Sequence, residues 1–555
     1  MCIRDSSLYR LFFLLILCPF LYSQDLGKIL WGEKPLTSPI NFDYILAESK
    51  NKNDINFSGS FYINPYPKGV GYDVIRDEKT FKNRKNEDLF LKFPDFRVDL
   101  SIQGQNVIVH NKKIIDTDDK FWDLSFSDGM AWSREDHVYV TAPFTLIQKH
   151  ANCSHNGVLL FALNSLNEIS QSIFQISSET CAYFQFNYVA IFDSFFETND
   201  NDNKFITKTQ NSKSIDDLYE KYPSIFRGSF ADSDAFNADE VTAYGFFDGE
   251  EHFIGPCLTR SGNYPFCDNL LLPAYSLTKT IGGTLGIAAY QKKYGSIVDI
   301  KINDLVSACS KNKWKDITIE NLSDMATGQY KSLVHYGDED SLASVNFIFN
   351  NLSHEEKVDF SCNNYPKKKN PGTTFVYHTS DTYLIGTSLN NLLSDKKEND
   401  FFDDLLVPIF NHHNFSEKIK YIRRTNDIRN QPYTGWGMFL QRDDLIKLNS
   451  LLQSPERIKY FSKEFLDEGL QRTEDKGLLA IKQSDIFYNN GFWAARFDKN
   501  IFGCKEDLMI PFMSGFGGIT VVFLPNSMMY YYFSDNFTFS WYSAVYAAHN
   551  IKPLC

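Results

Sequence analysis

The chain has 555 residues, more than one ordinary hydrophobic core accommodates, so we expect two domains. Hydrophobic residues make up 43% of it and aromatic residues 15%, enough to bury a sizeable interior, which argues against a largely disordered chain. The formal charge of −13 leaves no overall basic field to collect phosphate groups, which argues against a nucleic-acid-binding function.

A short apolar run near the N-terminus predicts a signal peptide over residues 1–23. Arg4 and Arg10 precede the apolar stretch Leu11–Leu21, and polar residues follow it. The run is shorter than the ~20 apolar residues of a membrane helix, so we expect no integral membrane segment beyond the signal peptide. An uncleaved anchor is the alternative, and the bulky residue before Cys18 disfavours a lipid anchor there. The predicted location is periplasmic or secreted.

Removal of that segment takes away Cys2 and Cys18 and leaves an even set of cysteines, which fits disulfides formed in an oxidising compartment. Cys257 and Cys267 are close enough in sequence to close a small loop ahead of residue 276. Metal binding is the rival interpretation of the cysteines. The chain has no C-x-x-C pair and no H-E-x-x-H motif, so we expect no metal site.

Residues 24–197 are predicted to form an all-β, sandwich-like N-terminal domain. Aromatic and polar residues alternate along Phe184–Tyr188, and short apolar runs such as Val107–Val109 and Val158–Leu163 are bounded by turn residues. This half contains no catalytic motif. Its function stays open among substrate binding, attachment to a partner and shielding of the second domain.

Residues 198–240 are predicted to be a linker that carries one short helix. The composition turns to Asn, Asp, Lys and Thr between Thr198 and Ser214, with little to bury. Ser214, with an aspartate three residues later, predicts a helix start, and Pro223 ends that helix.

Residues 241–555 mix strands and helices and predict an α+β domain. Val241–Phe247 and Glu251–Ile254 are expected to form one hairpin, and Ile519–Leu524 and Met528–Phe533 another. An apolar helix is predicted after Ser276.

The tetrad Ser276–Lys279 has the S-x-x-K form that serves as a nucleophile motif in β-lactamases and penicillin-binding proteins. Spacing alone selects nothing, because Ser49, Ser310 and Ser394 are also followed by lysine three residues later. Of the four tetrads, the one at Ser276 alone is followed by apolar residues at helical spacing, with Gly295 available as a helix stop.

A serine at the start of a buried helix lies near free backbone N–H groups that favour a developing negative charge. Lys279 lies one turn along the same face, so its amine can reach the Ser276 hydroxyl. Burial lowers the pKa of such an ammonium, and the neutral amine would accept the serine proton near neutral pH. The alternative is an ordinary capping serine, with Lys279 extending to the surface.

The segment Pro371–Gly386 resembles the second motif of class C β-lactamases and related esterases, in which a Tyr-x-Asn or Tyr-x-Ser tripeptide opens a helix. Tyr377 takes the tyrosine position, and Thr379 stands in place of the asparagine. A phenol beside an ammonium is expected to lose its proton more easily and to relay it between nucleophile and leaving group. The alternative for Tyr377 is a core tyrosine.

The segment Ser514–Ile519 resembles the third motif of the same family, Lys-Thr-Gly or His-x-Gly on the strand that edges the active site. The resemblance implies substrate and oxyanion contacts from Phe516, Gly517, Gly518 and Ile519, together with Thr379 of the second motif. Glycines allow close approach of the substrate, and the next N–H would complete an oxyanion hole with that of the nucleophile. The alternative is a glycine-rich turn before a hairpin.

The three motifs occur in the family order, and Ile317–Gly328 and Gly435–Leu445 resemble further stretches of it. Residues Val241–His549 are therefore similar to the β-lactamase-related serine hydrolases. The resemblance implies an antiparallel sheet flanked by helices and a serine acyl-enzyme. It also implies a small-molecule or peptide ester or amide as substrate, and no cofactor.

Two departures from the family pattern refine the expected activity. Phe516 offers no charge to a substrate carboxylate, so we do not expect penicillin hydrolysis, and Thr379 lacks an amide group. Both changes favour an esterase or amidase of the 6-aminohexanoate-dimer hydrolase type. The alternatives are a non-catalytic binding or sensor protein of the same fold, and a D-Ala-D-Ala carboxypeptidase. The sequence does not indicate the oligomeric state.

Overall fold

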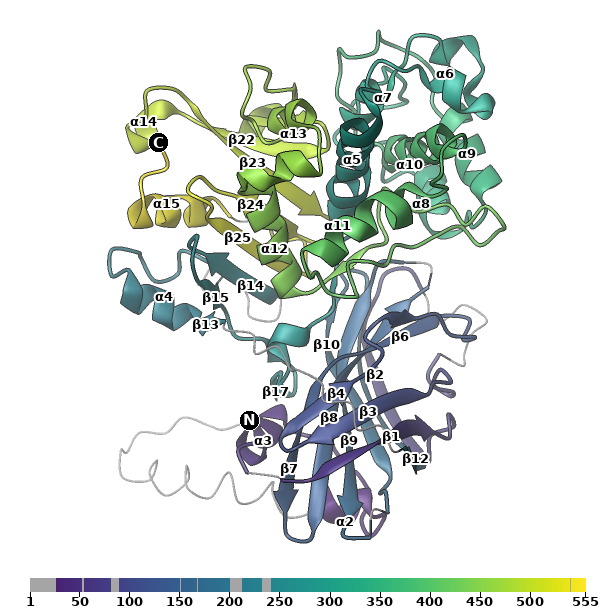
Figure 1. Cartoon of the computed structure of the whole chain (residues 1–555), viewed down its shortest axis with the longest axis vertical. Coiled ribbons are helices and arrows are strands. Elements are labelled where there is room, and N and C mark those ends of the chain that lie inside the picture. Colours follow the sequence, from purple (N-terminus) through teal and green to yellow (C-terminus); the bar gives the residue numbers. More distant parts are fainter. Residues whose placement is uncertain are drawn as a thin grey trace.

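The computed structural model describes residues 26–51, 54–80, 89–149, 151–166, 168–199, 212–231, 241–539 and 541–555, so the predicted signal peptide lies outside the described residues. Two large sheets organise these residues (Figure 1). The N-terminal sheet occupies the lower half of the view. The C-terminal sheet lies at the upper left, with a helical region beside it.

The N-terminal half forms one twelve-stranded antiparallel sheet, with the order β12-β1-β3-β4-β7-β8-β9-β10-β11-β2 and with β5 and β6 attached beside β8. Its strands are β1 (Asn56–Ile63), β2 (Gly69–Asp77), β3 (Val98–Gln103), β4 (Asn106–Val109), β5 (Ile114–Ile115), β6 (Trp122–Phe126), β7 (Gly129–Arg134), β8 (His137–Gln148), β9 (Ser154–Asn164), β10 (Ser172–Thr180), β11 (Phe184–Phe192) and β12 (Ser194–Thr198).

The β content matches the prediction, and the strands connect into a single curled sheet rather than two separate ones. Phe61 on β1 and Phe161 on β9 show the curl, because their rings stack 4.8 Å apart although four strands lie between them in the sheet. The alternation along β11 follows from this shape. Phe184 and Phe186 are fully buried, whereas Asn187 is partly exposed.

The C-terminal sheet has nine strands in the order β13-β15-β14-β25-β24-β23-β22-β21-β20. Its strands are β13 (Lys213–Ser214), β14 (Val241–Phe247), β15 (His252–Ile254), β20 (Leu478–Ile481), β21 (Ile486–Asn489), β22 (Phe492–Phe497), β23 (Leu508–Gly515), β24 (Ile519–Phe523) and β25 (Met529–Ser534). Both predicted hairpins are confirmed, since β14 pairs with β15 and β24 pairs with β25. Two small sheets pair β16 (Leu258–Thr259) with β17 (Gly262–Asn263) and β18 (Leu272–Pro273) with β19 (Phe439–Leu440).

Most helices accompany the C-terminal sheet, which gives the predicted α+β arrangement. They are α2 (Leu26–Leu30), α3 (Phe42–Glu48), α4 (Ile215–Lys221), α5 (Leu285–Tyr294), α6 (Ile302–Leu305), α7 (Ile319–Ser323), α8 (Leu342–Phe349), α9 (His354–Asn363), α10 (Thr379–Leu393), α11 (Val407–His412), α12 (Arg442–Gln453), α13 (Lys463–Gly469), α14 (Lys499–Phe502) and α15 (Tyr542–Ile551). The structure confirms two helix ends that capping residues predicted, the start of α4 and the end of α5. Ser214 and Asp217 form a capping box on α4, and Gly295 ends α5 with a φ of 101°.

Four disulfides cross-link the described chain, in agreement with the even number of cysteines. They join Cys153 to Cys181, Cys257 to Cys267, Cys309 to Cys362, and Cys504 to Cys555. Within the described ranges no helix is long and apolar enough to span a membrane, and no group of His, Cys, Asp and Glu side chains is arranged to hold a metal ion.

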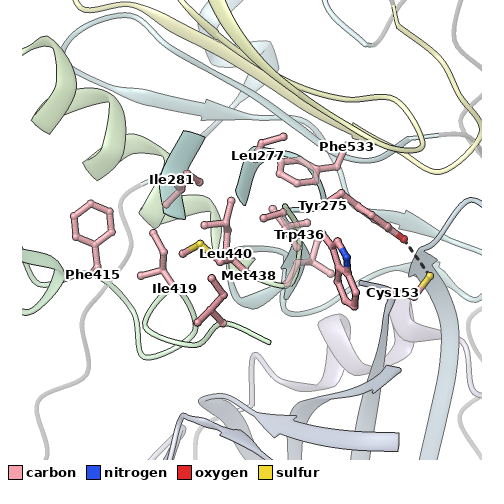
Figure 2. Packing of buried hydrophobic residues seen from close by; sticks show 14 of the residues in the cluster. Cys153, Tyr275, Leu277, Ile281, Phe415, Ile419, Trp436, Met438, Leu440 and Phe533 are labelled. Carbon is pink, nitrogen blue, oxygen red and sulfur yellow. Dashed lines mark hydrogen bonds between the residues drawn. The ribbon is translucent and has the colours of Figure 1, made fainter. Parts of the chain in front are cut away.

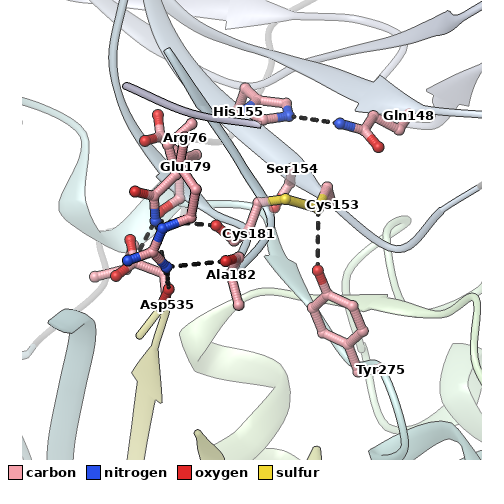
Figure 3. The surroundings of a disulfide bond; sticks show 12 residues. Arg76, Gln148, Cys153, Ser154, His155, Glu179, Cys181, Ala182, Tyr275 and Asp535 are labelled. Carbon is pink, nitrogen blue, oxygen red and sulfur yellow. Dashed lines mark hydrogen bonds between the residues drawn. A yellow bond between two sulfur atoms is a disulfide. The ribbon is translucent and has the colours of Figure 1, made fainter. Parts of the chain in front are cut away.

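The two halves of the chain pack tightly against each other. Their buried apolar side chains form one continuous cluster that extends from the curled sheet to the helices around α5. Polar contacts reinforce it. Arg260 binds Glu179 through two hydrogen bonds of 2.9 Å, and Arg76 donates to the backbone carbonyls of Ala182 and Asp535 (Figure 3). The N-terminal half is therefore packed onto the region that contains the S-x-x-K tetrad.

Candidate active site

The S-x-x-K tetrad lies at the start of a buried helical segment. Strand β18 leads to Ser276, and a wide π-type turn over Lys279–Thr284 passes into α5. Leu277 and Ile281 are fully buried, and Figure 2 shows them in one apolar cluster with Met438. The apolar spacing predicted in the sequence therefore fixes the helix in the core, while Ser276 itself stays partly exposed.

Among the described residues the Lys279 amine has three hydrogen-bond partners, and their chemistry fixes its orientation. Nζ lies 2.8 Å from the Gly435 carbonyl oxygen, 2.9 Å from Thr379 Oγ1 and 3.0 Å from Ser276 Oγ. The carbonyl can only accept, and the Thr379 hydroxyl donates its own proton to Glu339, so both take an N–H from the amine. When Lys279 is neutral, its remaining lone pair points at Ser276 Oγ.

Burial lowers the pKa of Lys279 to about 8, and the Glu339 carboxylate acts in the opposite direction. Lys279 as a residue is 3% exposed, so its ammonium has lost most of its hydration. A substantial fraction of Lys279 is therefore neutral at mildly alkaline pH, as a proton acceptor for a serine requires.

Tyr377 completes the group, because its hydroxyl donates to Ser276 Oγ over 2.8 Å. Its ring stacks on Trp493 with centroids 5.9 Å apart, which fixes the phenol at the entrance to α10. The expectation that this phenol loses its proton easily is wrong, because burial raises its pKa well above the ordinary value. Tyr377 is therefore a hydrogen-bond donor to the serine, and of the two groups only Lys279 has a pKa lowered towards neutral pH.

Above Ser276 lies a cavity of about 370 Å³ with largely aromatic and aliphatic walls. Its lining residues come from both halves of the chain and are Lys79, Ala151, Asn152, Tyr183, Tyr275, Ser276, Tyr336, Glu339, Asp340, Val345, Ile348, Phe349, Tyr377, Thr379, Gly435, Trp436, Trp493, Ser514, Gly515, Phe516, Gly517, Phe537 and Phe539. The N-terminal half, which contains no motif of its own, thus contributes part of the wall.

The residues of the glycine-rich segment that line this cavity lie two positions earlier in the sequence than those predicted from the third motif. Phe516 and Gly517 line the cavity, but Gly518 and Ile519 do not. The Ile519 side chain is fully buried in the core, and the Gly518 carbonyl accepts the Ser534 N–H. Gly518 and Ile519, which the sequence predicted as site residues, therefore do not line the cavity, and the residues of this segment that do are Ser514–Gly517.

Glu339 is a site residue that the sequence did not reveal. Its carboxylate accepts the Thr379 N–H over 3.0 Å as well as the Thr379 hydroxyl proton. The preceding Asp338 anchors the segment through His378, whose Nε2 lies 3.0 Å from the Asp338 carboxylate. Burial alone would lower the pKa of His378, but its bonds to Asp338 and Asp381 outweigh burial and raise that pKa to about 9. No periodicity or motif marks Glu339 in the sequence.

Comparison with known proteins returned solved structures, whereas no family model and no curated protein matches the chain. A structure named as a 6-aminohexanoate-dimer hydrolase from Bacillus anthracis is 14% identical, with a TM-score of 0.41 over 57% of this chain and 80% of that one. A mutant class C β-lactamase is 14% identical, with a TM-score of 0.40 over 61% and 94%. A structure named as a β-lactamase from Bacteroides dorei DSM 17855 is 13% identical, with a TM-score of 0.38 over 58% and 88%. In fold, the chain is similar to 6-aminohexanoate-dimer hydrolase and to class C β-lactamases.

Proposed function

We propose that this chain is a serine hydrolase that cleaves an ester or an amide through an acyl-enzyme on Ser276. The observation that carries the proposal is the meeting of three groups at the cavity. Ser276 Oγ lies 3.0 Å from the Lys279 amine and 2.8 Å from the Tyr377 hydroxyl. A hydroxyl flanked by an amine of lowered pKa and by a phenol donor is arranged for nucleophilic attack.

In the acylation step, Ser276 Oγ bonds to the substrate carbonyl carbon while its proton passes to neutral Lys279. The bond to the leaving alcohol or amine then breaks, and the leaving group takes that proton from the Lys279 ammonium. Water then bonds to the acyl carbon while Lys279 accepts one of its protons. The bond between that carbon and Ser276 Oγ breaks, and Oγ takes the proton back from Lys279, which releases the acid and restores the serine. Tyr377 donates a hydrogen bond to the serine oxygen throughout, which orients it towards the carbonyl.

The negative charge on the carbonyl oxygen requires fixed donors. Ser276 and Phe516 both line the cavity, and neither backbone N–H has an acceptor among the described residues. We assign the oxyanion hole to these two groups, in place of the Ile519 N–H.

The residues around the serine favour an uncharged acyl group. The walls are mainly aromatic and aliphatic, and the exposed Phe516 at the rim supplies no cation where the family motif has a lysine or histidine, so Lys79 is the one basic side chain among the described residues that line the cavity. We therefore propose an esterase or amidase activity and do not expect penicillin hydrolysis or release of D-alanine from cell-wall peptides.

The four disulfides are consistent with an oxidising compartment, and with the predicted signal peptide they support an exported, periplasmic or secreted protein. We further propose that residues 24–197 and 241–555 form separate domains joined by residues 198–240, of which β13 and α4 pack onto the C-terminal sheet.

Turnover of p-nitrophenyl esters and p-nitroanilides tests the proposal. The intact protein should release p-nitrophenol, Ser276→Ala should abolish the release, and Lys279→Met should lower it strongly. Ser310→Ala is the matched control, because Ser310 begins another S-x-x-K tetrad at an exposed position away from the cavity. If folded wild-type protein neither turns over any ester nor reacts with a fluorophosphonate probe, the chain is a non-catalytic binding protein of this fold.

A further inference from the structure

A single buried amide from the N-terminal half lies against the loops that carry the serine and the lysine acceptor. Asn152 precedes β9, is 2% exposed and contributes to the cavity wall. Its partners are more than a hundred residues away in sequence, on two segments of the C-terminal part. A buried amide keeps its place only when its donors and acceptors are satisfied.

The first of these segments contains the residue before the nucleophile. Asn152 Oδ1 accepts the Tyr275 N–H over 2.7 Å. Tyr275 has a φ of 43°, in the left-handed region that a tyrosine rarely adopts, so surrounding contacts must hold it there. The position of Ser276 depends directly on that backbone, because the two residues share a peptide bond.

The second segment contains the carbonyl that orients the lysine. The same Oδ1 accepts the Gly437 N–H over 3.1 Å, and Asn152 Nδ2 donates to the Met438 carbonyl over 3.2 Å. Gly435, two residues before Gly437, accepts from the Lys279 amine. One side chain thus joins the loop of the serine to the loop that fixes its proton acceptor.

The neighbouring disulfide holds the side chain of the same tyrosine. The Tyr275 hydroxyl lies 3.1 Å from the sulfur of Cys153, which is bonded to Cys181 and has no hydrogen to donate, so the phenol donates (Figures 2 and 3). Asn152 and Cys153 therefore fix the backbone and the ring of Tyr275 together.

We infer that Asn152 is a positioning residue of the active site. Its amide sets the distance between Ser276 Oγ and Lys279 Nζ by holding the Tyr275 backbone and the Gly435–Met438 loop in one arrangement. This inference rests on the proposed function. It makes the N-terminal half a working part of the catalytic site rather than an attached recognition module.

The test compares Asn152→Leu with Asn156→Leu. Asn156 is also buried in the N-terminal half and also crosses to the C-terminal part, where it bonds the Leu271 backbone, and neither residue lines the cavity. Both leucine variants lose buried hydrogen bonds and should lose comparable thermal stability. Single-turnover acylation by a p-nitrophenyl ester, measured where both variants are folded, should fall about 10- to 100-fold in Asn152→Leu and stay near wild type in Asn156→Leu.

Two further readouts separate positioning from stability. In Asn152→Leu the pH of half-maximal acylation should move downward, because a displaced Gly435 carbonyl stabilises the Lys279 ammonium less. Asn152→Asp keeps an oxygen for both N–H donors and should recover much of the lost rate. Equal acylation by the two leucine variants, or an aspartate variant no better than Asn152→Leu, would overturn the inference. A folded wild-type protein that is never acylated would remove the proposed function and this inference with it.

Discussion

Glu339 raises the pKa of the buried Lys279 amine and with it the pH at which the proposed nucleophile becomes active, so replacing it with glutamine should shift that pH downward. Neutral Lys279 accepts the serine proton, so acylation should rise about tenfold per pH unit up to the lysine pKa and level off above it. In the wild type this pKa is about 8. The Glu339 carboxylate stabilises the ammonium, so its removal lowers the pKa and raises the neutral fraction at lower pH.

The size of the shift follows from the geometry. Thr379 bridges the two charges through hydrogen bonds on either side, which places them roughly 5 Å apart. At that distance Coulomb attraction amounts to about 1–3 kcal/mol for effective dielectric constants between those of water and a protein surface, or roughly one to two pH units. Glutamine keeps an oxygen that can accept the Thr379 N–H, so the substitution mainly removes the negative charge.

The assay is the single-turnover acylation rate between about pH 5.5 and 9.5 in wild-type, Glu339→Gln and Asp340→Asn protein, a range that spans the Lys279 pKa of about 8 and extends further below it than above. Asp340 is the matched control, since it also lines the cavity but does not perturb the Lys279 pKa. The inflection should move to lower pH in Glu339→Gln and stay in place in Asp340→Asn. An unchanged inflection in Glu339→Gln, or one that moves to higher pH, would refute the assignment of Lys279 as the base under Glu339 control.

Three further predictions concern other parts of the site and the scaffold. Tyr377→Phe should slow acylation about 100-fold while the melting temperature changes little, because the ring still stacks on Trp493; equal rates would contradict the donor role. His378, whose pKa is raised to about 9, stabilises the fold fully below about pH 6.5, and this stabilisation disappears as pH rises through 9. The difference in the free energy of unfolding between wild type and His378→Gln should therefore shrink by about 3 kcal/mol over that window in urea titrations. A difference that stays constant would contradict the raised pKa. Replacing Cys309 and Cys362 by serine opens a loop with a sequence separation of 53 and should cost about 4 kcal/mol in the same titrations, whereas a loss under 1 kcal/mol would contradict the chain-entropy argument.

The elements that sequence reasoning predicted are those with local signals. The helix after Ser276 has apolar spacing and a glycine stop, and both hairpins have turn residues between alternating strands. Tyr377 was placed correctly at the head of α10, because the motif order constrains it. The pKa of Tyr377 could not be read in the same way, since it depends on how deeply the folded chain buries the phenol.

The parts that the sequence could not supply depend on long-range contacts. Asn152 meets Tyr275 across a separation of 123 residues, and Glu339 meets Thr379 across 40, with no repeat or motif to connect them. The segment Ser514–Ile519 contains three glycines, and a strand presents the same face every two residues. The pattern alone therefore leaves a two-residue ambiguity, which the pairing of Gly515 with Ile519 resolves.

Mass spectrometry of protein quenched in acid during turnover of a p-nitrophenyl ester tests the central claim most directly. We expect the acyl mass on the peptide that contains Ser276, and no adduct in Ser276→Ala. Steady turnover with the acyl group on another side chain, or with no covalent adduct at any quench time, would contradict an acyl-enzyme at Ser276.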